Sequence, residues 1–351
     1  MSFTSLSQLA RQAEERGLSI ARLMMSVEER QSGLDEDELM AKMASQFAVM
    51  EQAVRKGILE PERSRTGLTG QDAARVHAYL GRGASFVPPE PLRAMAYALA
   101  VSEVNAAMGR IVATPTAGAA GILPGVLVSL LDSGRYTRDQ LVCSLFTAAA
   151  LGLAIANAAC ISGAAGGCQA EVGSATAMAA GALVELAGGS PQAAVHAAAL
   201  ALQNSLGLVC DPVAGLVEVP CVTRNGLHAI TALAAADMAL AGATRATALV
   251  ASSIGGGKVE VIELDGLHVR FTGERFTLIL YHVDEQGFLA RVSRLLDERG
   301  SNIARLSLER WTKGGDAVTV CEVDQPVPSS VLADLRTGIR GVRDIRVVSV
   351  F

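Results

Sequence analysis

Three of the six cysteines stand where side chains from separate loops could meet. Cys168 follows the glycine pair of "SGAAGGCQAEVG", Cys210 begins "CDPVAG", and Cys221 ends "VEVPC". Each lies beside Gly or Pro, and the spacings are 42 and 11 residues. Thiolates bind zinc and iron–sulfur clusters, but no Cys-x-x-Cys pair is present, which argues against an ordinary structural zinc site. Three thiolates would leave a cubane cluster with one iron that has no protein ligand.

The other three cysteines fit a packing role. Cys143 and Cys160 fall in Ala-rich segments with helical periodicity, and Cys321 falls in a predicted strand. Free cysteine is among the most buried residue types and packs as a small hydrophobe. We therefore expect all three to lie in the core.

Composition limits the classes of protein and partner. The 351 residues carry a net charge of -5, so no basic surface indicates nucleic acid. No apolar segment of the secretory kind begins the sequence, which predicts a cytoplasmic protein whose thiols stay reduced. Hydrophobic residues make up 50% of the chain but aromatic residues only 4%. Such a core must be built from Ala, Leu, Val and Gly in closely packed helices.

One segment imitates a membrane span. Between Asp139 and Glu171 there is no charged residue, and a span needs about 20 apolar residues. The stretch is rich in Ala, Gly, Ser and Asn, and it lacks the aromatic anchors of a membrane interface. We expect a buried helix of a helical domain and no membrane association.

Residues 1–250 have helical periodicity. In the segment 36–57 an apolar stripe runs through Leu39, Phe47 and Val54, with Asp35 as predicted N-cap and Gly57 as predicted end. Further helices are predicted near 71–81, 91–110, 121–133, 139–160, 173–187, 191–206 and 223–242.

The character of the sequence changes after residue 250. The segment 251–275 is predicted to hold a flexible junction, "SSIGGGK", and a hairpin about Asp265 and Gly266. Residues 276–351 alternate as strand, helix, strand, strand, helix and strand. This βαββαβ order predicts a ferredoxin-like α+β unit. The expected fold is therefore multi-domain: an all-α helical domain followed by a small α+β domain.

Polar residues near the cysteines could bind a substrate. Arg224 and Asn225 follow Cys221 by three and four residues, and an Arg fork can bind a carboxylate bidentately. Arg224 could equally pair at a helix start. The loop "SRTGLTG" offers the hydroxyl groups of Ser64, Thr66 and Thr69, although a plain turn is the alternative. No side chain stands out as a catalytic base, and the five histidines form no triad.

Four segments carry a resemblance to a known family. They are "TGLTGQDA", "NAAMGRIVATPTAGAAGILPG", "GCQAEVGSATAMAAGALVELAGG" and "NSLGLVCDPVAGLVEVPCVTRN". Over residues 1–245 the chain resembles the α subunit of iron–sulfur-dependent L-serine dehydratase. The resemblance implies that Cys168, Cys210 and Cys221 ligate a 4Fe–4S cluster with one open iron. It also implies a carbon–nitrogen lyase that converts L-serine to pyruvate and ammonia, with the open iron acting as a Lewis acid.

The C-terminal segment resembles the end of the same family's β subunit, including its ACT domain. That resemblance implies amino-acid binding between paired ACT domains by Asp284, Gly287 and Asn302, whereas a pure dimerisation module is the alternative. The Ser-His-Thr segment of the family's β portion occurs nowhere in the sequence. We therefore expect a homo-oligomer, a separate β chain, or both. A catalytically incomplete sensing or regulatory subunit is the competing interpretation, and an iron–sulfur electron carrier is disfavoured because no fourth thiolate is evident.

Overall fold

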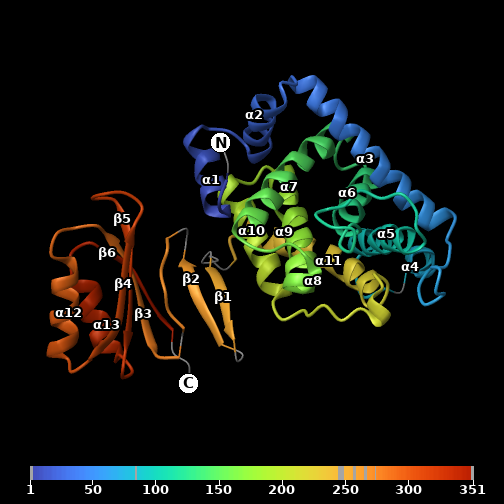
Figure 1. The fold of residues 1–351 in the computed structure, drawn as a ribbon. Coiled ribbons are helices and arrows are strands. Elements are labelled where there is room, and N and C mark those ends of the chain that lie inside the picture. Colours follow the sequence, from blue (N-terminus) through green and yellow to red (C-terminus); the bar gives the residue numbers. More distant parts are fainter. Residues whose placement is uncertain are drawn as a thin grey trace. The chain divides into compact units, whose positions relative to one another are not determined.

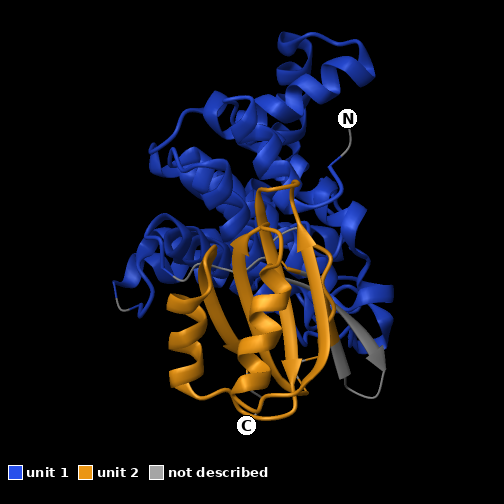
Figure 2. Ribbon diagram, turned by 90° about the vertical axis from the view of Figure 1, so that its left-hand side faces the viewer, with its two compact units in different colours: residues 1–246 blue, residues 247–351 orange. Residues whose placement is uncertain are grey.

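The computed structural model describes residues 3–83, 85–243, 249–255, 258–264, 267–272 and 274–348. The chain divides into two compact units, Met1–Ala246 and Thr247–Phe351, which Figure 2 shows in different colours. Unit 1 is helical, and unit 2 contains the strands. The observed classes of the two units agree with the sequence prediction of helices followed by an α+β region.

The regular elements of the described part of unit 1 are helices, which loops connect (Figure 1). They are α1 (Leu6–Glu15), α2 (Ile20–Ser32), α3 (Glu36–Leu59), α4 (Asp72–Tyr79), α5 (Pro89–Ala106), α6 (Ile122–Ser133), α7 (Arg138–Ala158), α8 (Gly163–Gly166), α9 (Cys168–Leu186), α10 (Pro191–Ser205) and α11 (Cys221–Leu240), with short 3₁₀ turns η1 (Leu80–Arg82) and η2 (Val213–Gly215).

Helix α3 shows how local sequence sets an element. Asp35 accepts a hydrogen bond from the backbone N–H of Glu38, and the Glu38 side chain returns one, so a capping box starts the helix. The predicted end at Gly57 is wrong, because α3 continues to Leu59. A Cβ at Gly57 would lie 2.6 Å from the carbonyl oxygen of Ala100 in α5, so the glycine permits close helix packing there.

The charge-free segment forms a core helix. α7 is long and apolar enough to cross a membrane by composition, but 67% of its apolar window is buried inside the protein. Its Leu141, Leu145 and Leu151 belong to the main hydrophobic core of unit 1. The burial confirms the prediction of a core helix.

Unit 2 contains a two-stranded and a four-stranded sheet. β1 (Leu249–Gly255) pairs antiparallel with β2 (Lys258–Leu264). The larger sheet has the order β4-β5-β3-β6 and is antiparallel throughout. Its elements are β3 (Phe276–Val283), α12 (Phe288–Glu298), β4 (Ile303–Arg310), β5 (Asp316–Val323), α13 (Ser329–Gly338) and β6 (Val342–Val348).

The two faces of this sheet pack against different partners. Leu278 and Leu280 of β3 share a core with helix residues such as Phe288 and Leu296. Ile279, which points to the opposite face, packs instead with the preceding segment that includes Phe271. Figure 1 shows α12 and α13 together on one side of the sheet. The alternation follows from the two-residue period of a strand.

The first four residues of the junction predicted at "SSIGGGK" belong to a strand, whereas Gly256 and Gly257 lie outside the described residues. Residues 249–255 form β1, because backbone hydrogen bonds to β2 fix a strand without requiring apolar alternation. The predicted turn at Asp265 and Gly266 lies outside the described residues. Its flanks do pair, since Leu264 bridges to Leu267 and Val261 to Phe271.

His282 is a buried titratable group within unit 2. It is 1% exposed and its ring stacks on Phe288 with centroids 3.5 Å apart. Nδ1 lies 2.8 Å from the carbonyl oxygen of Val283, and Nε2 lies 2.8 Å from Thr319 Oγ1. A carbonyl only accepts, so Nδ1 carries the proton and Thr319 donates to Nε2. Burial lowers the pKa of His282, although Val283 and Asp284 oppose the shift.

We expect the stability of unit 2 to fall below about pH 6.5. The unfolded histidine has a pKa of about 6.5 and the folded one is lower, so the unfolded state binds the extra proton as pH falls. Denaturation followed by fluorescence of Trp311, the single tryptophan, measures this in the full chain. His282→Gln should flatten the pH slope below about pH 6.5. Identical slopes for both proteins would contradict the assignment.

Candidate active site

Two of the three predicted cysteine ligands open helices. Cys168 is the first residue of α9 and Cys221 is the first residue of α11, while Cys210 lies in the loop between α10 and η2. The predicted helix starts at 173 and 223 were therefore too late. Unpaired backbone N–H groups and the helix dipole make a helix start favourable for negative charge.

Hydrogen bonds join the three cysteine-bearing segments. Nη1 of Arg224 lies 3.0 Å from Cys168 Sγ, 3.0 Å from the carbonyl oxygen of Val209 and 2.8 Å from Asp211 Oδ1. The backbone N–H of Gln169 also donates to the Leu208 carbonyl at 2.9 Å. Arg224 thus forms an ion pair with Asp211 at the start of α11, which is one of the two roles predicted for it. Its binding of a substrate carboxylate stays a prediction.

The thiols of this region lie close enough to influence one another. Burial raises the pKa of Cys221 to about 11, and negative charge on Cys168 adds to the shift. Burial also raises the pKa of Cys168, although the hydrogen bond from Arg224 opposes it. Both thiols are therefore protonated at neutral pH without a metal, and metal binding would displace their protons.

Cys160 does not lie in the core. It is exposed, because α7 ends at Ala158 and Ala159 takes an extended conformation. Its Sγ accepts a hydrogen bond from the backbone N–H of Ser162 at 3.4 Å. The Ala-rich sequence contains no Gly or Pro at this helix end, so its pattern gave no signal to stop. The core prediction holds for Cys321, which is fully buried, and Cys143 is partly buried against the core.

Asn225 connects α11 with the glycine-rich loop at 114–121. It is 0% exposed. Its Oδ1 accepts from the N–H of Gly121 at 2.9 Å, and its Nδ2 donates to the carbonyls of Gly118 and Cys221 at 2.7 and 2.8 Å. These contacts give Asn225 a positioning role beside Cys221. Its contact with substrate stays a prediction.

The three predicted hydroxyl residues meet at a carboxylate that the sequence did not single out. Thr66 Oγ1 lies 3.0 and 2.9 Å from the two carboxylate oxygens of Glu218, and Thr69 Oγ1 lies 3.0 Å from Oε2. Ser64 Oγ lies 3.2 Å from Thr66 Oγ1. The only available signal was an acidic residue three positions before Cys221. The loop that carries Ser64, Thr66 and Thr69 is therefore more than a plain turn, since its hydroxyl groups bind Glu218 in the segment before Cys221.

Glu218 is ionised in spite of its burial. It is 5% exposed, and burial alone would raise the pKa of its carboxyl group. Hydrogen bonds from Ser64, Thr66 and Thr69 outweigh the burial and lower the pKa.

A second carboxylate binds the glycine-rich loops on the other side of Cys168. Glu171, in the first turn of α9, accepts a hydrogen bond from the Thr116 hydroxyl. Side chains at Gly118 or Gly163 would collide with its carboxylate. The two glycines therefore allow both loops to approach Glu171 closely.

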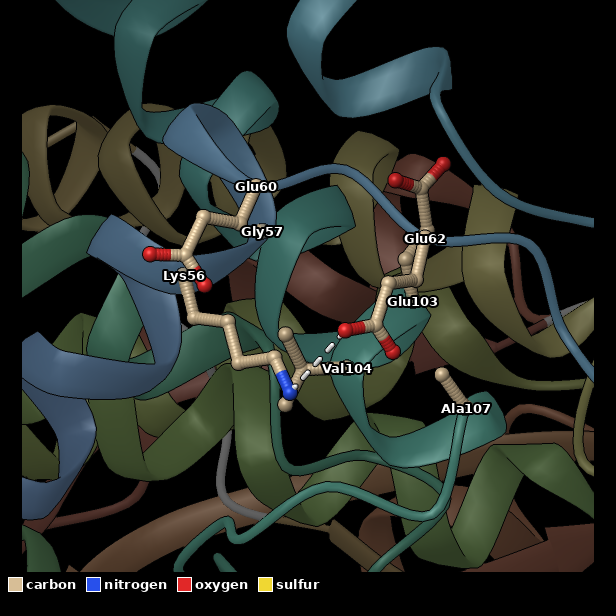
Figure 3. Close-up of a pocket in the computed structure, with 7 residues that line it drawn as sticks. All are labelled: Lys56, Gly57, Glu60, Glu62, Glu103, Val104 and Ala107. Atoms are coloured by element: carbon tan, nitrogen blue, oxygen red, sulfur yellow. Dashed lines mark ion pairs between the residues drawn. The ribbon is translucent and has the colours of Figure 1, made fainter.

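A third carboxylate, that of Glu103 in α5, accepts hydrogen bonds at the start of α4. α4 is the helix that follows the loop of Ser64, Thr66 and Thr69, called the hydroxyl loop here. Glu103 is buried and accepts from the backbone N–H groups of Asp72 and Ala73 at 2.8 and 3.3 Å. It lines a pocket of about 10 Å³ beside the Lys56–Glu62 ion pair (Figure 3). That space holds about one water molecule. The pocket is too small for an amino acid, so Glu103 serves as a cap for α4.

The cysteines do not form a site for a single metal ion. Within the described ranges, no three His, Cys, Asp or Glu side chains are grouped closely enough to hold one ion. A cubane cluster makes a different demand, because each thiolate binds its own iron. Its ligands therefore stand apart around the cluster instead of converging on one atom.

The residues predicted to bind a regulatory ligand lie in unit 2. Asp284 Oδ2 accepts from Arg310 Nη1 at 2.7 Å and from the N–H of Gly314 at 3.0 Å. Gly287 precedes α12 with φ of 78°, a conformation that favours glycine. Asn302 Nδ2 donates to Asp324 at 2.7 Å. Asp284 and Asn302 lie at opposite ends of the four-stranded sheet, because the end of β3 pairs with the start of β5 and the start of β4 pairs with the end of β5. Ligand binding by these residues stays a prediction.

Comparisons with known proteins place this geometry in context. The family model described as "Serine dehydratase alpha chain" matches residues 15–255. The "Probable L-serine dehydratase, alpha chain" of Bacillus subtilis is 51% identical over 69% of this chain and 80% of its own length. The "L-serine dehydratase, alpha chain" of Peptoniphilus asaccharolyticus is 42% identical over 65% of this chain and 78% of its own. The "L-serine dehydratase" of Streptomyces coelicolor is 42% identical over 68% of this chain and 53% of its own.

Replacing Asn225 tests its positioning role. Asn225→Leu removes three buried hydrogen bonds and leaves the Gly121 N–H without its partner, so we expect a loss of about 2–4 kcal/mol in the free energy of unfolding. Asn225→Asp keeps the acceptor for Gly121 but places a carboxylate oxygen against the carbonyls of Gly118 and Cys221, so it should also be destabilising. Chemical denaturation followed by helical circular dichroism measures both. A change below about 0.5 kcal/mol for Asn225→Leu, the range of ordinary surface substitutions, would contradict the role.

Proposed function

The chain belongs to the serine dehydratase alpha chain family, and from this membership we propose that it converts L-serine to pyruvate and ammonia as a carbon–nitrogen lyase. The observation that carries the proposal is the family match over residues 15–255. That range contains all three cysteine segments, the hydroxyl loop and Glu218. Elimination of water gives aminoacrylate, which tautomerises and hydrolyses without further need of the site.

The donor set fits a 4Fe–4S cluster on Cys168, Cys210 and Cys221. Thiolates are the usual ligands of such clusters, and the hydrogen bonds of Arg224 to Cys168, Val209 and Asp211 support the proximity of the three cysteine segments. When bound, the cluster would supply a Lewis-acidic iron with an open position for the leaving hydroxyl group. Two of the three ligands start helices, where backbone N–H groups favour the negative charge of a cluster.

The chain's other residues hold this arrangement still. Arg224 fixes the distance between the Cys168 and Cys210 segments, and Asn225 fixes the glycine-rich loop to Cys221. Glu218 fixes the hydroxyl loop to the segment before Cys221. A rigid frame matters because small displacements of reacting groups reduce rates strongly. The catalytic base is not assigned to any of these residues.

A separate β chain is the partner that we propose for unit 1. The match covers 53% of the Streptomyces coelicolor relative, so the rest of that relative has no counterpart in the match. Exposed apolar side chains lie in and beside the loop that carries Cys210. A group of exposed apolar side chains is typical of a surface that a partner protein covers. They are Leu206, Val209, Val213, Leu216, Val217, Val219 and Leu227.

Unit 2 is proposed to be an ACT-type regulatory module that also mediates homo-oligomerisation. Its strand order β4-β5-β3-β6 and its βαββαβ sequence fit the ferredoxin-like arrangement. Asp284, Gly287 and Asn302 are the proposed contacts to an amino acid. A reducing cytoplasm suits the protein, because all six cysteines are free.

Anaerobic assay of pyruvate formation tests the function directly. Protein reconstituted with iron and sulfide, together with a β chain where one is encoded beside it, should release pyruvate and ammonia from L-serine in equal amounts. The matched control omits iron. Equal rates with and without iron would contradict the cluster, and no pyruvate from the iron-loaded complex would contradict the dehydration.

Cysteine substitutions test the ligand set. Cys168→Ala, Cys210→Ala and Cys221→Ala should each lose the brown colour and most of the iron, which we expect at about four per chain in the wild type. Cys160→Ala is the matched control, and it should retain both. Iron content after anaerobic reconstitution is the measurement. Retention of iron by the first three variants, with loss by the control, would mean that the ligands were chosen wrongly.

A further inference from the structure

Glu218 is a buried anion that lacks a charged partner. Within the part of the chain that the structure describes, no Lys, Arg or His side chain forms an ion pair with it, and hydroxyl groups supply its hydrogen bonds instead. The nearby Arg224 pairs with Asp211 through Nη1. A buried carboxylate is costly unless a cation or hydrogen bonds compensate it. Hydroxyl groups keep Glu218 ionised while leaving its charge unmatched.

The surroundings of Glu218 suit a cationic ligand better than an anionic one. Thr66 and Thr69 direct their only hydroxyl protons toward the carboxylate. Those protons are not available to a substrate carboxylate. A ligand that approaches from the side of the loop therefore meets a negative charge and hydroxyl oxygens, which match an ammonium group.

The position of Glu218 relates it to the cysteines. It stands three residues before Cys221, and its carbonyl oxygen accepts from the N–H of Val222 at 2.8 Å. Glu218 and Cys221 thus both lie at the start of α11. In L-serine the ammonium and the hydroxyl group are on adjacent carbon atoms, so the groups that bind them must also be neighbours.

We propose that Glu218 binds the α-ammonium group of the amino-acid substrate, and thereby selects amino acids over hydroxy acids that lack the amino group. The inference rests on the proposed function, because it takes the cysteine segments as the place where L-serine reacts. In this arrangement Ser64, Thr66 and Thr69 do not contact the substrate carboxylate; their hydroxyl groups keep Glu218 charged.

The hydroxyl loop covers this receptor. Glu218 is 5% exposed, whereas Leu68 at the tip of the loop is 54% exposed. The substrate ammonium group reaches the Glu218 carboxylate when it displaces the hydroxyl group of Thr66, which donates to both carboxylate oxygens. The exchange is favourable because it replaces a neutral hydroxyl donor with an ammonium donor, and the opposite charges of ammonium and carboxylate attract each other.

Two ligands that differ only in the ammonium group test the proposal. L-alanine and propanoate both lack the hydroxyl group, so neither is dehydrated. Calorimetry on the iron-loaded full chain should show wild-type protein binding L-alanine about 10- to 100-fold more tightly than propanoate. Glu218→Gln should bind both equally weakly. The control Glu62→Gln, a surface residue paired with Lys56, should behave as wild type.

A second variant guards against a general loss of structure. Glu218→Asp keeps the charge, so it should retain a preference for L-alanine even if Glu218→Gln unfolds. A preference that survives in Glu218→Gln overturns the proposal, as does equal loss for both ligands or absence of preference in Glu218→Asp or the wild type. A wild-type chain that prefers L-alanine, but forms no pyruvate from L-serine when it is iron-loaded and combined with its β chain, contradicts the dehydration alone.

Discussion

Close approach of helix backbones is the constraint on which unit 1 depends. A Cβ at Gly121 or Gly125 would meet backbone atoms of Ala98 in α5, and one at Gly226 would meet the side chain of Leu99. Only small residues permit such contacts, and interiors packed at this density transmit displacements. The packing of α5 against α6 and α11 therefore fixes where the loop before α6 meets the first turns of α11. The cysteine segments are positioned by the same contacts.

Three carboxylates, two of them buried and that of Glu171 partly buried, then hold the loops against this frame. Glu218 binds the hydroxyl loop, Glu171 binds Thr116, and Glu103 caps α4. Each compensates its burial through hydrogen bonds from hydroxyl or backbone groups. Such contacts are directional, so they define loop conformations that apolar packing alone would leave open. The result is a set of short loops gathered at the starts of α9 and α11.

The sequence predicted the elements better than the contacts between them. Periodicity located α7 and the six elements of the four-stranded unit, because each pattern is local. The N-cap of α3 at Asp35 was also readable from the sequence. The end of α7 was missed, since the helix ends before Ala159 without Gly or Pro. Gly57 was wrongly predicted to end α3, because this glycine instead permits close packing against Ala100.

The site was predictable in its residue types and not in its geometry. Cysteines beside Gly and Pro marked the metal candidates, and the hydroxyl loop was noticed for its donors. Glu218 was overlooked because its partners are about 150 positions away in sequence, as the separation of 152 residues from Thr66 shows. Contacts between distant segments depend on the packed helices, which no local pattern encodes.

In the proposed reaction, L-serine binds at an open iron of a cluster held by three cysteines. Mössbauer spectroscopy of protein reconstituted with ⁵⁷Fe, recorded with and without L-serine, tests that claim most directly. The account predicts that one iron in about four changes its signal when L-serine is added, because only one lacks a cysteine ligand. A cluster whose irons all remain unchanged at saturating L-serine would contradict it.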